Sequence, residues 1–225
     1  MVEIVRRGRL AEYAYEYTKR MLFDGSLLPG AKLRVEDVVA SLQTSRQPVM
    51  DAFKRLASEG YLKITPQVGC RVVVPDSAEI ADFFLILGAV QGLAADIAAG
   101  RRTAEEIATL TGVSAAIEAL QTEPLTSQTA RIYHSLDHDF QQHVRAMAHS
   151  HAVAPISSGL LDRRDFYITC VANGEMRYAQ GMRAASGEYH SIVEAIAAGD
   201  ADRARSRTEA LVLALGRFTQ PEQRA

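Results

Sequence analysis

The fold of this chain is decided by one stretch, Thr44-Ser45-Arg46-Gln47-Pro48-Val49-Met50-Asp51-Ala52-Phe53-Lys54-Arg55-Leu56. Its apolar residues recur at helical spacing and predict one buried face, formed by Val49, Ala52, Phe53 and Leu56. Thr44 or Ser45 can cap the free amides of the first turn, and Pro48 falls inside that turn, where a missing N–H costs little. Gly60 is expected to end the helix, so the stretch predicts a short helix with a defined first and last turn.

The opposite face of this predicted helix is basic and polar. Arg46, Met50 and Lys54 follow one another at steps of four residues, and Gln47 lies beside Arg46. Arginine and glutamine side chains read the edges of guanine and adenine in the major groove of DNA. A helix that is apolar behind and basic in front therefore suits insertion into that groove.

The flanking sequence predicts a helix-turn-helix followed by a wing. An apolar stripe of two helical turns precedes the stretch, formed by Val35, Val38, Val39 and Leu42. Only Gln43 and Thr44 separate it from the second helix, which leaves room for a tight corner. After it, Tyr61–Ile64 and Arg71–Val74 read as two short strands of a hairpin. Gly69, before the second strand, allows the backbone to approach a phosphate or a minor groove closely.

The chain before this motif predicts one more helix and one short strand. The helix is expected over Leu10–Asp24, with one face formed by Leu10, Tyr13, Ala14, Tyr17 and Met21. Leu28-Pro29-Gly30 predicts a turn into the extended pair Lys32-Leu33. Pro75-Asp76-Ser77 is the expected boundary, which divides the chain into a winged helix-turn-helix domain (1–76) and a second domain (77–225).

The second domain is predicted to be helical throughout, so the fold class is mainly α with an antiparallel bundle after the winged helix. Expected helices are Ala78–Arg101, one that opens at a capping box on Thr103 and breaks near Gly112, Thr129–Ser150, Ala152–Ala172 with a kink near Pro155, Glu175–Ala198 and Asp202–Thr219. Glu123-Pro124 is expected to form a loop.

Charge is distributed unevenly between the two predicted domains. Residues 1–76 hold twelve Lys and Arg against nine Asp and Glu, whereas the remainder holds thirteen against eighteen, for a net charge of −2. This balance fits a DNA-binding part joined to a part that does not contact phosphates.

Cysteine use and hydropathy indicate a cytoplasmic protein. Cys70 and Cys170 do not suggest a disulfide framework or a zinc finger and are expected to be buried small residues. No stretch approaches the roughly 20 apolar residues that span a bilayer, so no membrane partner is expected.

The first domain resembles the DNA-binding domain of GntR-type bacterial transcription regulators. The matching residues are Gly25-x-Leu27-Leu28-Pro29-Gly30-x-x-Leu33, Ser45-Arg46-x-Pro48-Val49, Leu56-x-x-x-Gly60, and Gly69 before Val72. Where the family usually has Arg-Glu after Pro-Val, this chain has Met50-Asp51, so a second base-reading arginine is absent. The resemblance implies a homodimer on an inverted-repeat operator of double-stranded DNA. The expected DNA contacts are Lys32, Arg34, Ser45, Arg46, Gln47, Met50, Lys54, Gln67, Gly69 and Arg71.

The second domain resembles the all-helical FCD effector domain of the FadR-type subgroup of these regulators. The matching residues are Leu93-Ala94-Ala95-x-x-Ala98-Ala99 followed by Thr103, Asp137-x-x-Phe140, and Ile192-x-x-Ala195-Ile196-x-x-Gly199-Asp200. Many members of the subgroup hold a divalent metal with one Asp and three His. Here Asp137 matches, but the other ligand positions hold Gln141, Tyr189 and Leu211, so we expect the metal site to be lost and no cofactor to be required.

The resemblance then implies a small organic effector, held by Asp137, Gln141, Tyr189 and apolar walls. An arginine often found on the first helix of the domain is replaced by Leu87, so a less cationic pocket is expected. The alternative is that Asp137, Gln141 and Tyr189 satisfy one another in a core.

Several histidines have spacing that could chelate a metal on one helix. His134 and His138, and Asp139 and His143, lie four residues apart. We expect these side chains to spread around the helix without converging, and no zinc-protease motif, glycine-rich phosphate loop or nucleophile elbow is present. The sequence therefore predicts a ligand-responsive transcription repressor and not an enzyme. Two alternatives stay open: a DNA-binding module with no effector, and a metal-dependent hydrolase that uses the histidine-rich helix.

Overall fold

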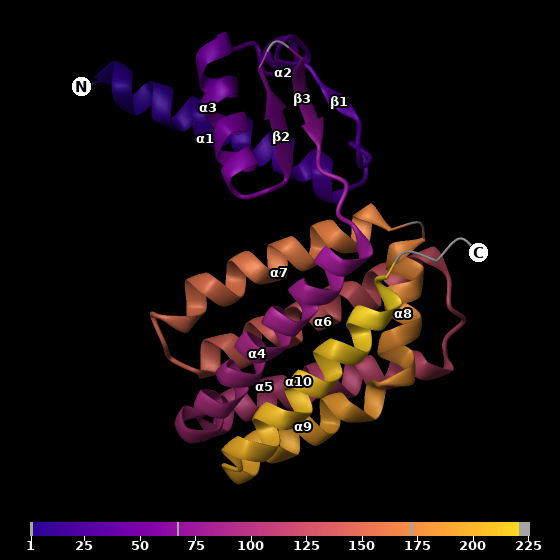
Figure 1. Ribbon diagram of the computed structural model, residues 1–225. Coiled ribbons are helices and arrows are strands. Elements are labelled where there is room, and N and C mark those ends of the chain that lie inside the picture. The colour runs from indigo at the N-terminus through magenta and orange to yellow at the C-terminus, as the bar shows by residue number, and fades with distance from the viewer. Residues whose placement is uncertain (1, 67, 172, 221–225) are drawn as a thin grey trace. The chain divides into compact units, whose positions relative to one another are not determined.

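The computed structural model describes the backbone of residues 2–66, 68–171 and 173–220, and the side chains of this set from Arg9 onward. Contacts divide the chain into two compact units, Met1–Pro75 and Asp76–Ala225. The described chain is mostly helical with one small three-stranded sheet (Figure 1), as the sequence predicted.

The first unit is a winged helix-turn-helix. Its elements are α1 (Val2–Phe23), β1 (Lys32–Leu33), α2 (Val35–Leu42), α3 (Arg46–Ser58), β2 (Leu62–Thr65) and β3 (Gly69–Val72). The strands form an antiparallel sheet in the order β1-β3-β2, in which Cys70 is paired with both Leu33 and Ile64. Both wing strands were predicted, although β2 begins and ends one residue later, and β3 two residues earlier, than expected.

The predicted buried face of α3 is confirmed, since Val49, Ala52, Phe53 and Leu56 are all buried. Its predicted stop is confirmed as well: Gly60 has φ +77° and its N–H donates to the carbonyl of Ala57. The predicted side-chain cap is wrong. Ser45 occupies the cap position with no side-chain hydrogen bond, and the Thr44 hydroxyl is buried without a partner among the described residues.

The predicted face of α1 is confirmed only in part. Ala14 is buried as predicted and Tyr17 and Met21 are half-buried, but Leu10 and Tyr13 are exposed. From Arg9 onward, where side chains are described, the other buried residues of the helix are Tyr15, Thr18 and Leu22. The Tyr15 hydroxyl donates to Glu59, and the Arg55 guanidinium lies 3.6 Å from the centre of the Tyr15 ring. These contacts with α3 turn Tyr15 inward, which a count of apolar residues does not detect because the partners are charged.

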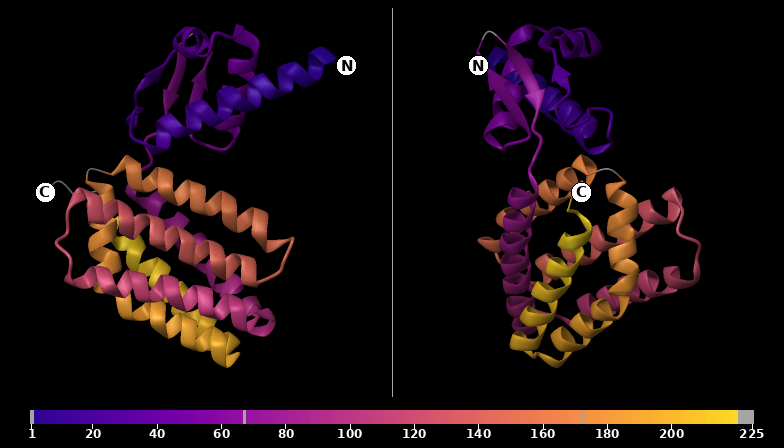
Figure 2. Two further views of the ribbon diagram at one scale, coloured as in Figure 1. Left: turned by 180° about the vertical axis from the view of Figure 1, so that it is seen from behind. Right: turned by 45° about the vertical axis from the view of Figure 1, so that its right-hand side comes forward.

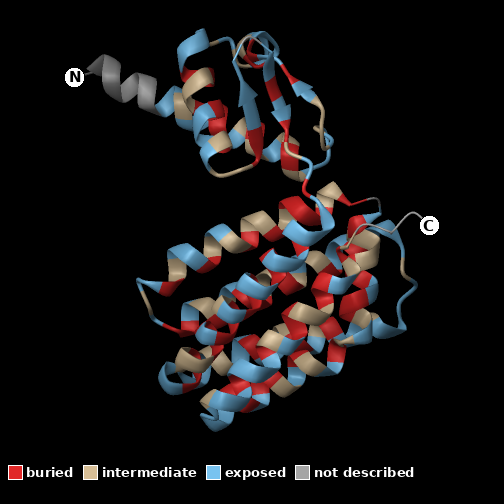
Figure 3. Ribbon diagram, in the orientation of Figure 1, coloured by how far each residue is buried: buried red, intermediate tan, exposed pale blue. Residues whose placement is uncertain are grey.

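The second unit is a bundle of helices. It contains α4 (Ser77–Arg101), α5 (Ala104–Ala119), the 3-10 turn η1 (Leu120–Thr122), α6 (Ser127–Met147), α7 (Val153–Cys170), α8 (Gly174–Ala184), α9 (Ser186–Ala198) and α10 (Ala201–Phe218). In this unit α10 packs along α4, and the views of Figure 2 show the two helices side by side. Buried residues gather on the faces that the helices turn toward one another (Figure 3).

Three helix predictions in this unit need correction. Helix α5 opens with the predicted capping box on Thr103 but continues through Gly112, because a glycine in a packed helix costs only about 1 kcal/mol. Pro155 lies in the first turn of α7, where proline is tolerated. The single helix expected over Glu175–Ala198 is divided at Ala185, next to Ser186-Gly187, a pair of residues that favours a break.

The structure also corrects the expectations about membrane-spanning segments and about the burial of the two cysteines. Helix α4 is long and apolar enough, by length and composition alone, to cross a membrane, contrary to the sequence expectation. This is weak evidence, because 56% of its apolar window is buried inside the unit and core helices pass the same test. Both cysteines are free, Cys70 buried and Cys170 only half-buried.

Candidate functional site

A groove of about 610 Å³ lies between α3 and the wing in the first unit. The predicted DNA contacts that line it are Lys32, Arg34, Arg46, Met50 and Gly69. Burial of the apolar face of α3 turns Arg46 and Met50 toward the groove. The predicted contacts Ser45, Gln47, Lys54 and Arg71 are exposed in the same unit but do not form the groove wall, and Gln67 lies outside the described residues.

Arg46 has a partner that the sequence did not indicate. Its guanidinium forms an ion pair with Glu36 in the first turn of α2, and about two thirds of each side chain is exposed. A backbone hydrogen bond at the start of α2, together with Arg46, holds the pKa of Glu36 below its ordinary value. Exposed ion pairs are weak, so a guanine can compete with Glu36 for Arg46. The contact crosses the turn between two helices, and helical spacing therefore gives no signal for it.

Two other residues that were predicted to contact DNA form hydrogen bonds within the first unit. The Gln47 side-chain amide donates to Asp51 at 2.8 Å, and the Arg71 guanidinium donates to the carbonyl of Gly30 at 3.1 Å. Each bond uses one donor of its side chain, so the remaining groups of the Gln47 amide and the Arg71 guanidinium stay available to a base or a phosphate.

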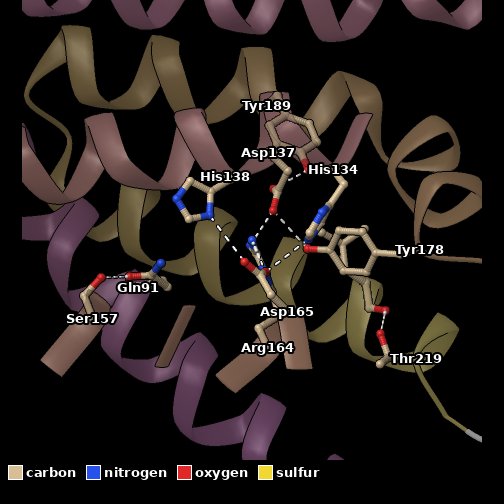
Figure 4. Close-up of polar contacts among 11 residues, drawn as sticks. Gln91, His134, Asp137, His138, Ser157, Arg164, Asp165, Tyr178, Tyr189 and Thr219 are labelled. Atoms are coloured by element: carbon tan, nitrogen blue, oxygen red, sulfur yellow. Dashed lines mark hydrogen bonds and ion pairs between the residues drawn. The ribbon is translucent and has the colours of Figure 1, made fainter. Parts of the chain in front are cut away.

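The second unit has a polar centre on the inner face of α6 (Figure 4). Asp137 is fully buried, and its Oδ2 accepts hydrogen bonds from the Arg164 guanidinium at 2.5 Å and from the Tyr178 hydroxyl at 3.0 Å. Its Oδ1 accepts one from the Tyr189 hydroxyl at 2.7 Å. Burial and the Asp137 carboxylate raise the pKa of Tyr189, so the phenol stays a donor. Both oxygens of this carboxylate are therefore occupied by protein donors.

A second carboxylate, Asp165, lies on the other side of Arg164. The Arg164 Nε atom donates to Asp165 at 2.9 Å, while His134 Nε2 lies 3.1 Å and His138 Nδ1 3.5 Å from the Asp165 carboxylate. Burial opposes the charge of Asp165, but Arg164 and the two histidines outweigh it and hold its pKa well below the usual range. Burial likewise opposes the charge of Arg164, and its acidic and phenolic neighbours hold its pKa above the ordinary value.

The structure brings together two of the three residues predicted to bind an effector. Asp137 and Tyr189 are in contact, whereas Gln141, one turn along α6, is buried with its Oε1 atom unpartnered among the described residues. Arg164 and Tyr178 were missed. A signal for Arg164 did exist, since it continues the helical spacing of the buried residues Ser157, Leu161 and Ile168 on α7.

One expectation about this centre is wrong. His134 and His138 were expected not to converge, yet both contact Asp165 because α7 presents this carboxylate between them. The replacement of an arginine by Leu87 predicts a pocket less cationic than is usual in the family, and the structure adds a fully buried cation, Arg164, from another helix.

A winged helix-turn-helix followed by a helical bundle with a buried polar centre defines a class of two-domain winged-helix proteins. A model of the family described as bacterial regulatory proteins, gntR family, matches residues 10–72, and a model of the FCD domain matches residues 82–214. The second match covers more than half of the chain. The chain therefore belongs to the gntR family of bacterial regulatory proteins, in the group that carries an FCD domain.

The similar proteins of known sequence match only part of the chain. An uncharacterized HTH-type transcriptional regulator in an unstable DNA locus of Streptomyces ambofaciens is 34% identical over 77 residues, covering 34% of this chain and 33% of the relative. The probable D-xylose utilization operon transcriptional repressor of Paenarthrobacter nicotinovorans is 31% identical over 103 residues, covering 45% and 46%. The chain thus spans between a third and half of the length of these curated relatives.

Solved structures match along nearly the whole chain. McbR/YncC of E. coli superposes with a TM-score of 0.69 at 19% identity, covering 90% of this chain and 93% of that one. A putative transcriptional regulator GntR from Rhodococcus sp. RHA1 has a TM-score of 0.68 at 18% identity, covering 92% and 94%. At this identity the likeness shows the fold alone.

The metal that the family resemblance implies does not fit the residues of the second unit. Asp137 has both oxygens engaged, and Gln141, Tyr189 and Leu211 stand at the other expected ligand positions. Leu211 is fully buried and has no donor atom. His190, the residue after Tyr189, is exposed and lies 3.4 Å from Glu194. Within the part of the chain that the structure describes, no group of three or more His, Cys, Asp or Glu side chains could hold a metal ion.

His138 predicts a pH dependence of stability. The Asp165 carboxylate raises the pKa of His138 above 6.5, although burial opposes the shift. Because the folded state binds this proton more tightly than the unfolded state, the stabilisation is full below about pH 6.5 and is lost as the pH rises through the folded-state pKa. We expect urea unfolding to show that His138→Gln costs more stability near pH 6 than near pH 8. A pH-independent cost for His138→Gln would contradict the contact with Asp165.

Proposed function

We propose that the chain is a ligand-responsive transcription repressor that acts in the cytoplasm as a homodimer and has no enzymatic activity. The observation that carries the DNA-binding part is the groove between α3 and the wing, where Arg46 lies with Lys32 and Arg34. The match to the gntR family model over residues 10–72 supports the same part. Repression is supported by the similarity to the probable repressor of Paenarthrobacter nicotinovorans.

The proposed DNA complex follows from the geometry of helix-turn-helix proteins. A symmetric dimer places two copies of α3 about 34–36 Å apart, so the operator is a short inverted repeat. Arg46 leaves Glu36 and contacts a guanine in two places, while Gln47 reads an adjacent base. Lys54, Arg71 and the Gly69 backbone hold phosphates, which position the domain without reading sequence.

The second unit is proposed to receive the effector near Asp137, Gln141 and Tyr189. The unpartnered Gln141 oxygen supports this location, because a buried acceptor without a donor is costly and a ligand hydroxyl or amide would satisfy it. An effector changes DNA affinity only if it binds one conformation of the dimer more tightly than another.

One observation favours the alternative of a DNA-binding module without an effector. Asp137 and Tyr189 hydrogen-bond each other and leave no oxygen of the carboxylate unpartnered. In that reading they form part of a filled core, and the second unit serves only for association between copies of the chain.

Arg46→Ala tests the DNA-binding proposal. An operator is first selected from a random pool of duplexes with the wild-type chain, and affinity is then measured by fluorescence anisotropy at fixed salt. We expect Arg46→Ala to weaken binding about 10- to 100-fold, the value of one bidentate base contact, with an unchanged melting temperature. Arg20→Ala, an exposed arginine outside the groove, is the matched control. Equal affinity of Arg46→Ala and wild type would remove Arg46 from the DNA surface.

Gln141→Leu tests the effector proposal. A panel of small metabolites is screened for those that both raise the melting temperature and change operator affinity. We expect Gln141→Leu to abolish both responses to such a metabolite without loss of stability, because it removes an unsatisfied buried acceptor. The exposed Gln142→Leu should respond as wild type does. If no metabolite shifts either quantity, the module without an effector is the better account.

A further inference from the structure

The centre of the second unit holds one cation that comes from the chain itself. Arg164 is 1% exposed and lies between two carboxylates, with Asp137 on one side and Asp165 on the other (Figure 4). Both residues that flank this guanidinium contribute oxygens at 2.5–2.9 Å. An arginine buried to this degree is stable only when its charge is matched by such partners.

Both oxygens of the Asp137 carboxylate accept hydrogen bonds from protein groups. The Arg164 guanidinium neutralises its charge, and the Tyr178 and Tyr189 hydroxyls donate to its oxygens. A divalent metal at this carboxylate would need the same oxygens. It would also stand next to a guanidinium of like charge in a buried site, where such repulsion is little screened.

The surroundings of Arg164 hold the guanidinium in place. Asp165 accepts from its Nε atom at 2.9 Å, and His134 and His138 contact the same carboxylate from α6. The planar guanidinium on α7 thus contacts Asp137 on α6 and Asp165 on its own helix, and Asp165 in turn contacts the two histidines of α6. Two-sided contact of this kind suits the fork of arginine better than the ammonium of lysine.

We infer that the Arg164 guanidinium stands in place of a divalent metal as the resident cation of the FCD domain of this chain. Any effector of the domain is then held by protein side chains and not through a metal on Asp137. This inference does not depend on DNA binding, and it concerns a different unit from the groove.

Metal analysis of the full chain tests the inference directly. The protein is purified without chelators, incubated with Zn²⁺, Ni²⁺ or Mn²⁺ and separated from free metal by gel filtration. We expect far less than one metal ion per chain by mass spectrometry and no shift of the melting temperature with any of the three ions. One ion per chain that is retained by wild type and lost in Asp137→Asn would overturn the inference.

A matched pair of variants tests whether the charge of Arg164 matters. Lysine and methionine have side chains of similar length, but only lysine keeps a cation beside Asp137. We expect both variants to melt below wild type, with Arg164→Lys above Arg164→Met, because lysine keeps the charge although it fits the two carboxylates less well. Equal melting temperatures of the two variants would contradict the inference. If neither variant folds, the metal content of the wild-type chain still decides the question.

Discussion

The buried ion pair between Asp137 and Arg164 is the contact on which the arrangement of the helical unit depends. Asp137 belongs to α6 and Arg164 to α7, and the tyrosines that complete the carboxylate come from α8 (Tyr178) and α9 (Tyr189). One carboxylate therefore fixes the spacing of these helices. A buried pair of this kind contributes little net stability, because desolvation offsets the attraction, but it strongly disfavours any packing that separates the partners.

The DNA-binding unit depends on a different kind of constraint, the division of α3 into two faces. The apolar face is buried against the rest of the unit. Arg46 lies on the opposite face and therefore lines the groove beside the wing. Glu36 pairs with Arg46 in that groove. In the proposed DNA complex this acidic group disfavours contacts that do not release Arg46 to a base.

The features that the sequence predicted are those set by residues close together in the chain, and the main features that it missed depend on residues far apart. The helix-turn-helix and the wing follow from short-range periodicity, and they were predicted because local spacing carries the information. The inward turn of Tyr15 was missed because it depends on a charged partner far away in the chain. The burial of Arg164 was missed although the spacing of α7 indicated it, because an arginine is rarely buried without a partner and its partner Asp137 lies on another helix. The break at Ser186 was missed for a related reason: a helical pattern continues through it, and only the local Ser-Gly pair opposes it.

The central claim is that Asp137 and Arg164 act in the helical unit as a coupled pair and not as independent polar residues. The most direct measurement is a double-mutant cycle in urea unfolding with Asp137→Asn, Arg164→Met and the double variant. The account predicts that each single substitution costs about 3–5 kcal/mol, because it leaves a buried group without its partner. The double variant should then lose clearly less than the two single losses together. Additive losses would show that the two residues act independently and would contradict the account.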